Sequence, residues 1–409
     1  MLRALAERYR TRGFVPVVPR VPWVPVVPLL LALAFVSCQR KPAPWFLLTD
    51  VVAPGIELYQ STDTTLVDPA APIAVSMVKL DPVKVRLASV LSKDDVMGVE
   101  RVDAMAARRG ALVAINGGFF NIKNGEPVGL LKVAGELVSD TEVQKGVVAI
   151  RAPAAGRTEL EFDQVAVRVV LSFRAGGRDW SVPVDGVDTT RERGKLMLYT
   201  PSYFMDSDTA PGGVEWMLTP ASTTDTFHVI DVRHDAGHTP IPAHGGVLSF
   251  GGLELPEALA ALVPKTDVTL ARQWISVHGA PPERLETADH VVNGAGLLKR
   301  DGRTPDNWQS HEKLNPQSFI GMRHPRTVIG TDAQGFIWFL VIDGRRPDFS
   351  VGMTLPELVR LCDRLNLRNA LNLDGGGSTT LVVKGVVVNR PTDPTGPRAV
   401  SDAIVATLR

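Results

Sequence analysis

Short β-branched runs of strand length most constrain what this chain can fold into. From Ile73 onward these runs alternate with a few stretches of helical spacing, and no internal repeat is present. Apolar residues make up 44% of the 409 residues and charged residues 22%, which provides enough apolar material for a sizeable core. The sequence therefore predicts an α+β fold in which mixed β-sheets pack with a few helices.

One β-α-β unit can be placed near residues 336–374. Phe336–Ile342 is an apolar run typical of a buried strand, and Ala370–Leu373 is a second such run. Between them, Thr354 and Glu357 have the spacing of a capping box that begins a helix. A right-handed crossover through this helix would leave the two strands parallel.

Polar side chains followed by glycine come directly after three of the predicted strands. They are Asn116 after residues 111–115, Asp343 after the first strand of the β-α-β unit, and Asp374 after the second. Ligands of such sheets bind at the carboxyl ends of the strands, so we expect these side chains to converge there. The glycines let backbone N–H groups approach an anion, as in a phosphate cradle. The predicted loop residues are Gly117, Gly118, Gly375, Gly376, Gly377 and Ser378.

Two arginines are candidates for gripping that anion. Arg326 directly precedes a predicted strand and is therefore expected to be buried at its start, while Arg345 follows Asp343 by two residues. A guanidinium fork matches a phosphate bidentately, although an ordinary surface position is the alternative for each arginine. Phe119 and Phe120, beside the first glycine loop, are expected to be core or pocket-wall residues rather than platforms for specific stacking.

Charge and histidine spacing limit the partners. The 44 Lys and Arg residues balance 44 Asp and Glu, so no nucleic-acid partner is expected. His234 and His238 are four residues apart in a predicted loop, which does not indicate a zinc pair. We expect no cofactor, but the oxygens of Asn116, Asp343 and Asp374 leave a divalent cation open. The metal ligands and the oligomeric state stay open as well.

Residues 1–38 resemble a bacterial export signal. A basic start precedes the apolar run Leu29–Ser37, which is far shorter than the roughly 20 residues of a membrane-spanning helix. The small residues before Cys38 resemble a lipobox, which predicts lipidation of Cys38 and a lipid anchor as the membrane contact. The alternative is an ordinary cleaved signal with an incidental cysteine. Either interpretation predicts an exported protein, facing the periplasm or carried as a surface lipoprotein of a bacterial envelope.

The rest of the chain divides into a tether and a folded domain. Residues 39–72, rich in Pro, Asp and Thr, are expected to be the tether. Residues 73–409 are expected to form the domain, which two lobes would also fit, with a variable insertion at about 151–190.

Six segments, in order across residues 73–409, resemble the phosphodiester glycosidase family. They are INGGFF (115–120), LYTP (198–201), NGAGLL (293–298), HPRT with IG (324–330), DGR with SVGMTL (343–355) and NLDGGGS (372–378). Two departures are the sequence NGAG in the family's glycine-rich loop and the missing cysteine-rich extensions of animal members. The resemblance implies an exported hydrolase that cleaves the glycosidic C–O bond of sugar-1-phosphodiesters in a cell-envelope or extracellular glycan.

The resemblance also implies roles for the candidate residues. Arg326 and residues 375–378 would cradle the phosphate, with Arg345 in support. Asp374 or Asp343 would act as nucleophile or water-activating base, and the sequence does not rank them. The distance between the two carboxylates depends on whether another strand lies between the strands that carry them. That distance matters because retaining and inverting glycosidases differ in the spacing of their two carboxylates.

Asn116 would bind a sugar hydroxyl or help to hold the phosphate. Two other functions remain open. One is a non-catalytic module that binds glycan phosphodiesters or assists exopolysaccharide assembly. The other is a metal-dependent phosphodiesterase that cuts the P–O bond.

Overall fold

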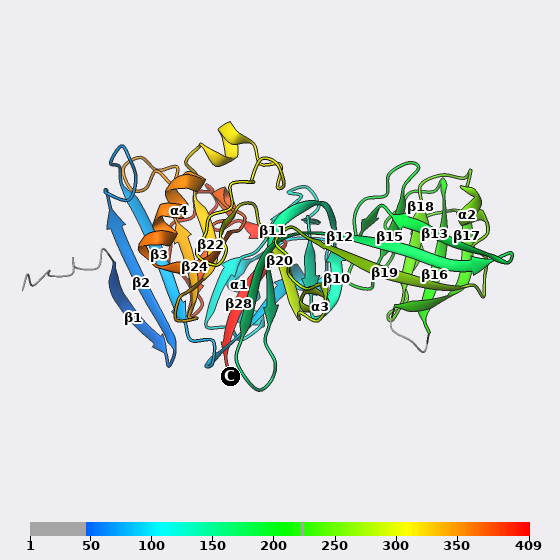
Figure 1. Ribbon diagram of the computed structural model, residues 1–409, viewed down its shortest axis with the longest axis horizontal. Coiled ribbons are helices and arrows are strands. Elements are labelled where there is room, and N and C mark those ends of the chain that lie inside the picture. The colour runs from blue at the N-terminus through cyan, green and yellow to red at the C-terminus, as the bar shows by residue number, and fades with distance from the viewer. Residues whose placement is uncertain (1–45, 222–224) are drawn as a thin grey trace, which may run out of the picture. The chain divides into compact units, whose positions relative to one another are not determined.

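The computed structural model of the protein describes residues 46–221 and 225–409 (Figure 1). The predicted export signal, with Cys38, and the start of the predicted tether lie outside these residues. Within the described residues, no helix is both long and apolar enough to cross a membrane.

A seven-stranded antiparallel sheet holds the predicted β-α-β unit. Its strands, in spatial order, are β1 (Leu47–Ala53), β2 (Ile56–Asp63), β3 (Ile73–Leu80), β23 (Ile337–Ile342), β22 (Arg326–Asp332), β24 (Leu367–Asn372) and β21 (Leu297–Lys299). Both β23 and β24 are antiparallel to β22, which lies between them, so the two run parallel to each other as predicted. Helix α4 (Leu355–Arg364) connects them and begins at the predicted capping box of Thr354 and Glu357.

Both faces of this sheet are buried, which explains the unbroken apolar run of β23. Alternate residues of a strand point to opposite faces. Phe339 packs in a core cluster with Ile115 of the neighbouring sheet, whereas Leu340 packs in another with Leu358 of α4. In Figure 1, α4 lies over the strands of this sheet.

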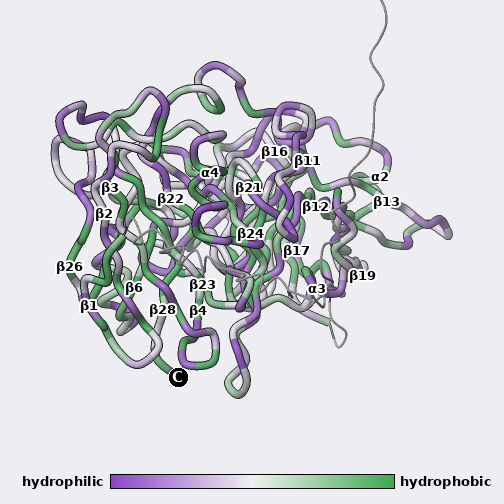
Figure 2. Tube along the Cα trace, turned by 60° about the vertical axis from the view of Figure 1, so that its left-hand side comes forward, coloured by the Kyte–Doolittle hydropathy of each residue, from purple (hydrophilic) through white to green (hydrophobic). Residues whose placement is uncertain are grey.

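A five-stranded sheet packs against the seven-stranded one through the first of these clusters. Its strands, in order, are β26 (Val386–Val387), β25 (Leu381–Val383), β6 (Val113–Asn116), β28 (Asp402–Leu408) and β4 (Val85–Leu91). In Figure 2, hydrophobic segments follow the strands of the interior and hydrophilic segments gather in the outer loops.

The largest sheet has twelve strands. Along its path they are β10 (Glu136–Ser139), β9 (Leu131–Val133), β20 (His290–Asn293), β11 (Thr141–Arg151), β12 (Glu159–Ala175), β19 (Asp267–Ser276), β17 (Thr226–Ala236), β16 (Gly213–Pro220), β18 (Gly246–Phe250), β15 (Leu196–Tyr199) and β14 (Gly186–Val187), with β13 (Arg178–Val184) paired to β12. The ends of this path meet, since the Val187 N–H donates to the Asp140 carboxylate at 3.1 Å. The sheet thus nearly closes on itself, around an apolar interior that includes Val167, Trp216 and Leu270.

The remaining elements are short. They are α1 (Val102–Arg108), α2 (Glu257–Ala260), α3 (Pro282–Glu286), the single turns η1 (Ser92–Asp94), η2 (Pro316–Ile320) and η3 (Gly376–Ser378), and the ladders β5 (Glu100–Arg101) with β27 (Ala399–Val400) and β7 (Phe119–Phe120) with β8 (Pro127–Val128). The described residues are therefore mainly β, and the α+β prediction fits only roughly.

One boundary drawn from the sequence needs correction. The predicted tether is wrong for residues 47–63, because β1 and β2 belong to the seven-stranded sheet. The variable insertion at about 151–190 stays a prediction, and within this range β12 pairs with β11, β13 and β19 of the twelve-stranded sheet. The described residues form one compact unit and are not divided into two lobes.

Candidate functional site

A pocket of about 310 Å³ lies where β22 begins and β24 ends. We call it the arginine pocket. Its lining residues are Phe119, Phe319, His324, Pro325, Arg326, Arg345, Asp374, Gly375, Gly376, Gly377 and Arg398. Six predicted site residues are therefore brought together here, as is the predicted wall residue Phe119.

Arg326 is buried at the start of β22, with 2% of its surface exposed. Its Nε donates to the carbonyl oxygen of Met353 at 2.9 Å, and one terminal nitrogen donates to the carbonyl oxygens of Phe319 and Met322 at 2.7 and 3.2 Å. No carboxylate of the described residues forms an ion pair with it. Burial, together with the charge of Arg345, lowers the pKa of Arg326 to about 10. The arginine is thus charged at neutral pH, and its charge is not balanced by a carboxylate in the described part of the chain.

Arg345 brings a second guanidinium to this pocket. It is exposed, its backbone is left-handed (φ 57°), and no acidic side chain pairs with it among the described residues. A terminal nitrogen lies 3.4 Å from Nδ1 of His324, whose Nε2 lies 2.9 Å from the Ser318 carbonyl oxygen. By contrast Arg398, the third arginine of the pocket, is paired with Asp393 at 2.7 Å.

Asp374 is the single carboxylate among the lining residues described for the arginine pocket. Burial raises the pKa of Asp374 to about 6, and the nearby Asp402 adds to this rise. The opposing influences are the Gly375 N–H, which donates to Oδ1 at 2.8 Å, and the nearby Ser378 hydroxyl, which makes no hydrogen bond of good geometry. Asp374 therefore changes charge just below neutral pH.

The glycines after Asp374 allow close packing, but most of their N–H groups do not point to a ligand. A Cβ on Gly376 would lie 3.0 Å from the Arg345 guanidinium, and one on Gly377 would lie 2.1 Å from Oδ1 of Asp393. The N–H groups of Gly375, Gly376 and Ser378 already donate within the protein. The predicted N–H cradle is wrong for these three groups, because the turn uses them for its own hydrogen bonds.

Asn116 ties three segments together and does not line the arginine pocket. Its Oδ1 accepts hydrogen bonds from the Thr327 hydroxyl (2.8 Å) and the Thr380 N–H (3.1 Å), and its Nδ2 donates to the Asp374 carbonyl oxygen (2.8 Å). The side chain is fully buried. Its geometry fits a residue that positions Asp374 rather than one that contacts substrate.

The glycines after Asn116 likewise serve a buried partner, Asp402, at the start of β28. The Gly118 N–H donates to both carboxylate oxygens at 3.1 and 3.2 Å, and a Cβ on Gly117 would lie 1.8 Å from one of them. These glycines are therefore not placed to bind an anion of the substrate. Burial raises the pKa of Asp402 to about 6.

Asp343 does not join Asp374, so the predicted convergence of the two aspartates is wrong. It lines a different pocket of about 370 Å³, here called the Asp343 pocket, together with residues of β2 and β3. Its carboxylate accepts hydrogen bonds from Asn389 Nδ2 and the Arg390 N–H, both at 3.0 Å. Strand β22 lies between β23 and β24, whose carboxyl ends lead to Asp343 and Asp374. Another strand therefore does separate the strands that carry the two aspartates.

Sequence reasoning missed several residues near the arginine pocket. His324 carries a signal, because it directly precedes Pro325 and Arg326. Phe319 and Arg398 carry no comparable motif, and Asp402 reaches Gly118 from a segment 284 residues away.

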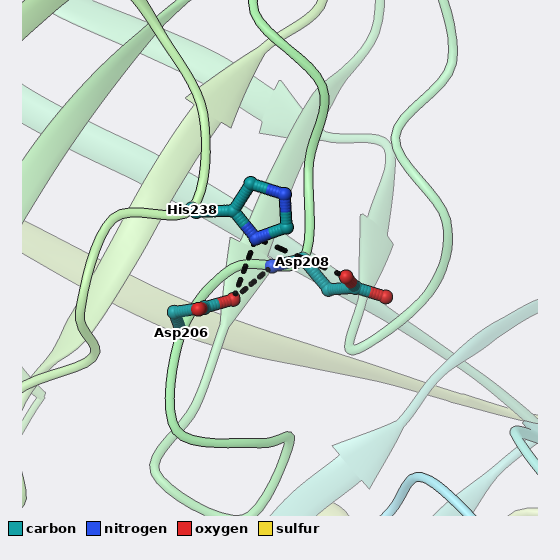
Figure 3. A group of neighbouring side chains, drawn as sticks. All are labelled: Asp206, Asp208 and His238. Carbon is teal, nitrogen blue, oxygen red and sulfur yellow. Dashed lines mark hydrogen bonds and ion pairs between the residues drawn. The ribbon is translucent and has the colours of Figure 1, made fainter.

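A group of three potential metal ligands lies elsewhere, on loops next to the twelve-stranded sheet. Figure 3 shows the His238 ring beside Asp206 and Asp208, with Nδ1 at 3.3 Å from one carboxylate and 3.9 Å from the other. It is the one such group found among the described residues. His234 is not part of this group.

Comparison with known proteins connects this pocket to a family. Residues 231–407 match the family described as phosphodiester glycosidase. This range contains every lining residue described for the arginine pocket except Phe119. Four of the six segments, at residues 293–298, 324–330, 343–355 and 372–378, lie within this range. The resemblance of this region to the phosphodiester glycosidase family is therefore confirmed.

Individual relatives match shorter stretches or the fold alone. The N-acetylglucosamine-1-phosphodiester alpha-N-acetylglucosaminidase of Bos taurus is 35% identical over 103 residues, which are 25% of this chain and 19% of that protein. The Homo sapiens protein of the same name is 35% identical over 103 residues and 20% of its length.

Two solved structures share the fold at low identity. A hypothetical protein from Synechocystis has a TM-score of 0.71 at 22% identity, covering 87% of this chain and 63% of that one. A protein from Burkholderia pseudomallei has a TM-score of 0.67 at 23% identity, covering 82% of this chain and 74% of that one.

Proposed function

We propose that the protein is a hydrolase that cleaves the glycosidic C–O bond of sugar-1-phosphodiesters. The single observation that carries this proposal is the buried Arg326, which has no acidic partner among the residues that the structure describes and lies in one pocket with Arg345 and Asp374. A buried charge is costly unless it is paired, so a bound anion would supply the missing partner. The family match of residues 231–407 supports a phosphodiester as that anion.

The pocket chemistry suits departure of a phosphate. When the C–O bond breaks, the bridging oxygen stays with phosphorus, and the phosphate changes from a diester with one charge to a monoester that gains a second. Arg326 and Arg345 would therefore bind the transition state more strongly than the substrate, which is what accelerates a reaction. The second pKa of a phosphomonoester is near 6, so the leaving group needs no strong acid.

Asp374 would act on the anomeric carbon as a carboxylate. With a pKa of about 6 it is mostly ionised at neutral pH and can attack the carbon or activate a water. Asp343 lines another pocket and would not form a two-carboxylate pair with it. Asn116 would hold the Asp374 backbone in place through its 2.8 Å hydrogen bond.

We further propose that the protein is exported and acts on a phosphodiester-linked glycan of the cell envelope. The support is the basic start, the apolar run 29–37 and Cys38 in the sequence. The name of the mammalian relatives makes N-acetylglucosamine the first sugar to test.

The test is hydrolysis of a nitrophenyl diester of N-acetylglucosamine 1-phosphate in ¹⁸O-labelled water. We expect the label in the released sugar, because the oxygen of water takes the place of the bridging oxygen on the anomeric carbon. Label in the phosphate would instead show P–O cleavage and contradict the proposal. Binding without turnover across several sugars would support the non-catalytic alternative.

A further inference from the structure

Asp402 lies next to Asp374, and Gly117 connects their main chains. The Asp374 N–H donates to the Gly117 carbonyl oxygen at 3.2 Å, and the Gly117 N–H donates to the Asp402 carbonyl oxygen at 2.9 Å. The carboxylate of Asp402 lies against the same glycine, since a Cβ on Gly117 would lie 1.8 Å from Oδ2 of Asp402. Two consecutive hydrogen bonds therefore join the backbone of Asp402 to that of Asp374.

The Asp402 carboxylate is enclosed by protein and accepts hydrogen bonds from neutral donors. The Gly118 N–H donates to both of its oxygens at 3.1 and 3.2 Å, and the Ser401 hydroxyl donates to Oδ1 at 3.0 Å. Asp402 is 1% exposed, and no lysine or arginine of the described residues forms an ion pair with it. When it is ionised, this carboxylate therefore places an unpaired negative charge inside the protein.

Asp402 acts on Asp374 against the positive charges of the arginine pocket. The basic side chains that line this pocket with Asp374 are His324, Arg326, Arg345 and Arg398. Burial and then the charge of Asp402 raise the pKa of Asp374, whereas the charge of Arg398 lowers it. Asp402 is not among the lining residues described for the pocket, so it reaches a bound substrate only through Asp374.

We propose that Asp402 is a positioning residue for Asp374. It fixes the Gly117 carbonyl that receives the Asp374 N–H, and its buried charge opposes the ionisation of Asp374. The inference rests on the proposed function, in which Asp374 acts on the anomeric carbon, and it gives that reaction a second carboxylate in place of Asp343. A carboxylate held beside a like charge is a stronger base and nucleophile, because losing its own charge relieves the repulsion.

The pH dependence of kcat/KM in Asp402→Asn tests the charge while keeping the shape. The substrate is the nitrophenyl diester of N-acetylglucosamine 1-phosphate. Asparagine keeps an oxygen that accepts the Gly118 N–H. We expect the acid side of the profile to move at least about half a pH unit lower, because Asp374 then ionises without a neighbouring negative charge. A purely structural role would instead lower kcat/KM by the same factor at every pH.

Ser401→Ala is a milder variant that tests the same charge if Asp402→Asn does not fold. The Ser401 hydroxyl stabilises the ionised form of Asp402 through its 3.0 Å hydrogen bond. Without this hydroxyl Asp402 is protonated over a wider range of pH, so the profile should move in the same direction by a smaller amount.

Asp188→Asn is the matched control. Asp188 is also buried, accepts hydrogen bonds from the Thr200 N–H at 2.7 Å and the Thr200 hydroxyl at 2.6 Å, and does not line the arginine pocket. Its substitution removes a buried carboxylate elsewhere in the chain and should leave the acid side of the profile in place. Equal movement of the profile in Asp188→Asn and Asp402→Asn would overturn the role of Asp402.

A ¹³C titration of the Asp374 carboxyl group separates this inference from the proposed function, because it needs no turnover. The signal is assigned by its loss in Asp374→Asn. We expect Asp374 to ionise at lower pH in Asp402→Asn than in the wild type. A titration that stays in place or moves to higher pH overturns the role of Asp402, and hydrolysis by the wild type then leaves the proposed function standing. A titration at lower pH without hydrolysis by the wild type supports the link between the two aspartates and counts against the proposed function.

Discussion

Replacing Arg326 with methionine should separate its role in binding from its role in stability. Methionine keeps much of the side-chain volume and removes the charge. The lowering of the Arg326 pKa to about 10 corresponds to about 3 kcal/mol of unfavourable burial at 1.36 kcal/mol per pKa unit. Against this, the variant loses three hydrogen bonds from a charged group to main-chain carbonyls, each worth about 1.5 to 3 kcal/mol. The lost hydrogen bonds outweigh the relieved burial, so the free energy of unfolding should fall by roughly 2 to 6 kcal/mol.

Activity should respond very differently to the same substitution. A hydrogen bond to a charged group contributes about 1.5 to 3 kcal/mol, so kcat/KM for the sugar phosphodiester should fall about 10- to 150-fold. Urea denaturation in phosphate-free buffer measures the stability, and steady-state kinetics measure the activity. The exposed Arg178→Met is the control and should change neither.

Two results would refute this reasoning about Arg326. An unchanged kcat/KM would show that the guanidinium does not hold the phosphate. A variant more stable than the wild type would show that the three hydrogen bonds to carbonyls contribute less than the burial of the charge costs.

Three further predictions concern the carboxylates and the glycine turn. Because Asp374 acts ionised and burial raises its pKa to about 6, kcat/KM should rise between pH 5 and 7, and Asp374→Asn should abolish turnover; a rate that falls over this range would make it an acid instead. Burial raises the pKa of Asp402 to about 6, so the folded state binds more protons than the unfolded state between about pH 4 and 6. The free energy of unfolding should therefore decrease as pH rises through that window. Urea titrations at several pH values should show a smaller decrease for Asp402→Asn. Gly377→Ala places a Cβ 2.1 Å from Oδ1 of Asp393, so it should displace the Asp393–Arg398 pair and reduce kcat/KM at least tenfold, whereas wild-type activity would show that the turn can yield.

Local sequence signals predicted the β-α-β unit because its determinants are local. The capping box at Thr354 and Glu357 begins α4, and the unbroken apolar run of β23 reflects burial on both faces. The burial of Arg326 at the start of β22 also followed from its position before a strand. These features depend on neighbours in the sequence.

The errors came from long-range pairing. The sequence could not show that β22 lies between β23 and β24, so Asp343 and Asp374 were expected in one site. The partners of Asn116 and the buried Asp402 are likewise set by segments more than 200 residues away.

The N-terminal strands were missed for a different reason. Among the described residues β1 is an edge strand that pairs only with β2, and most of its side chains are exposed. Its residues therefore lack the regular alternation of apolar and polar positions that predicts a half-buried strand.

The most direct test of the proposed site is a crystal structure of the Asp374→Asn variant soaked with the methyl diester of N-acetylglucosamine 1-phosphate. The phosphate is predicted to lie within hydrogen-bonding distance of both Arg326 and Arg345, with residue 374 facing the anomeric carbon. Phosphate bound outside the arginine pocket, or an anomeric carbon turned away from residue 374, would contradict the proposed hydrolysis.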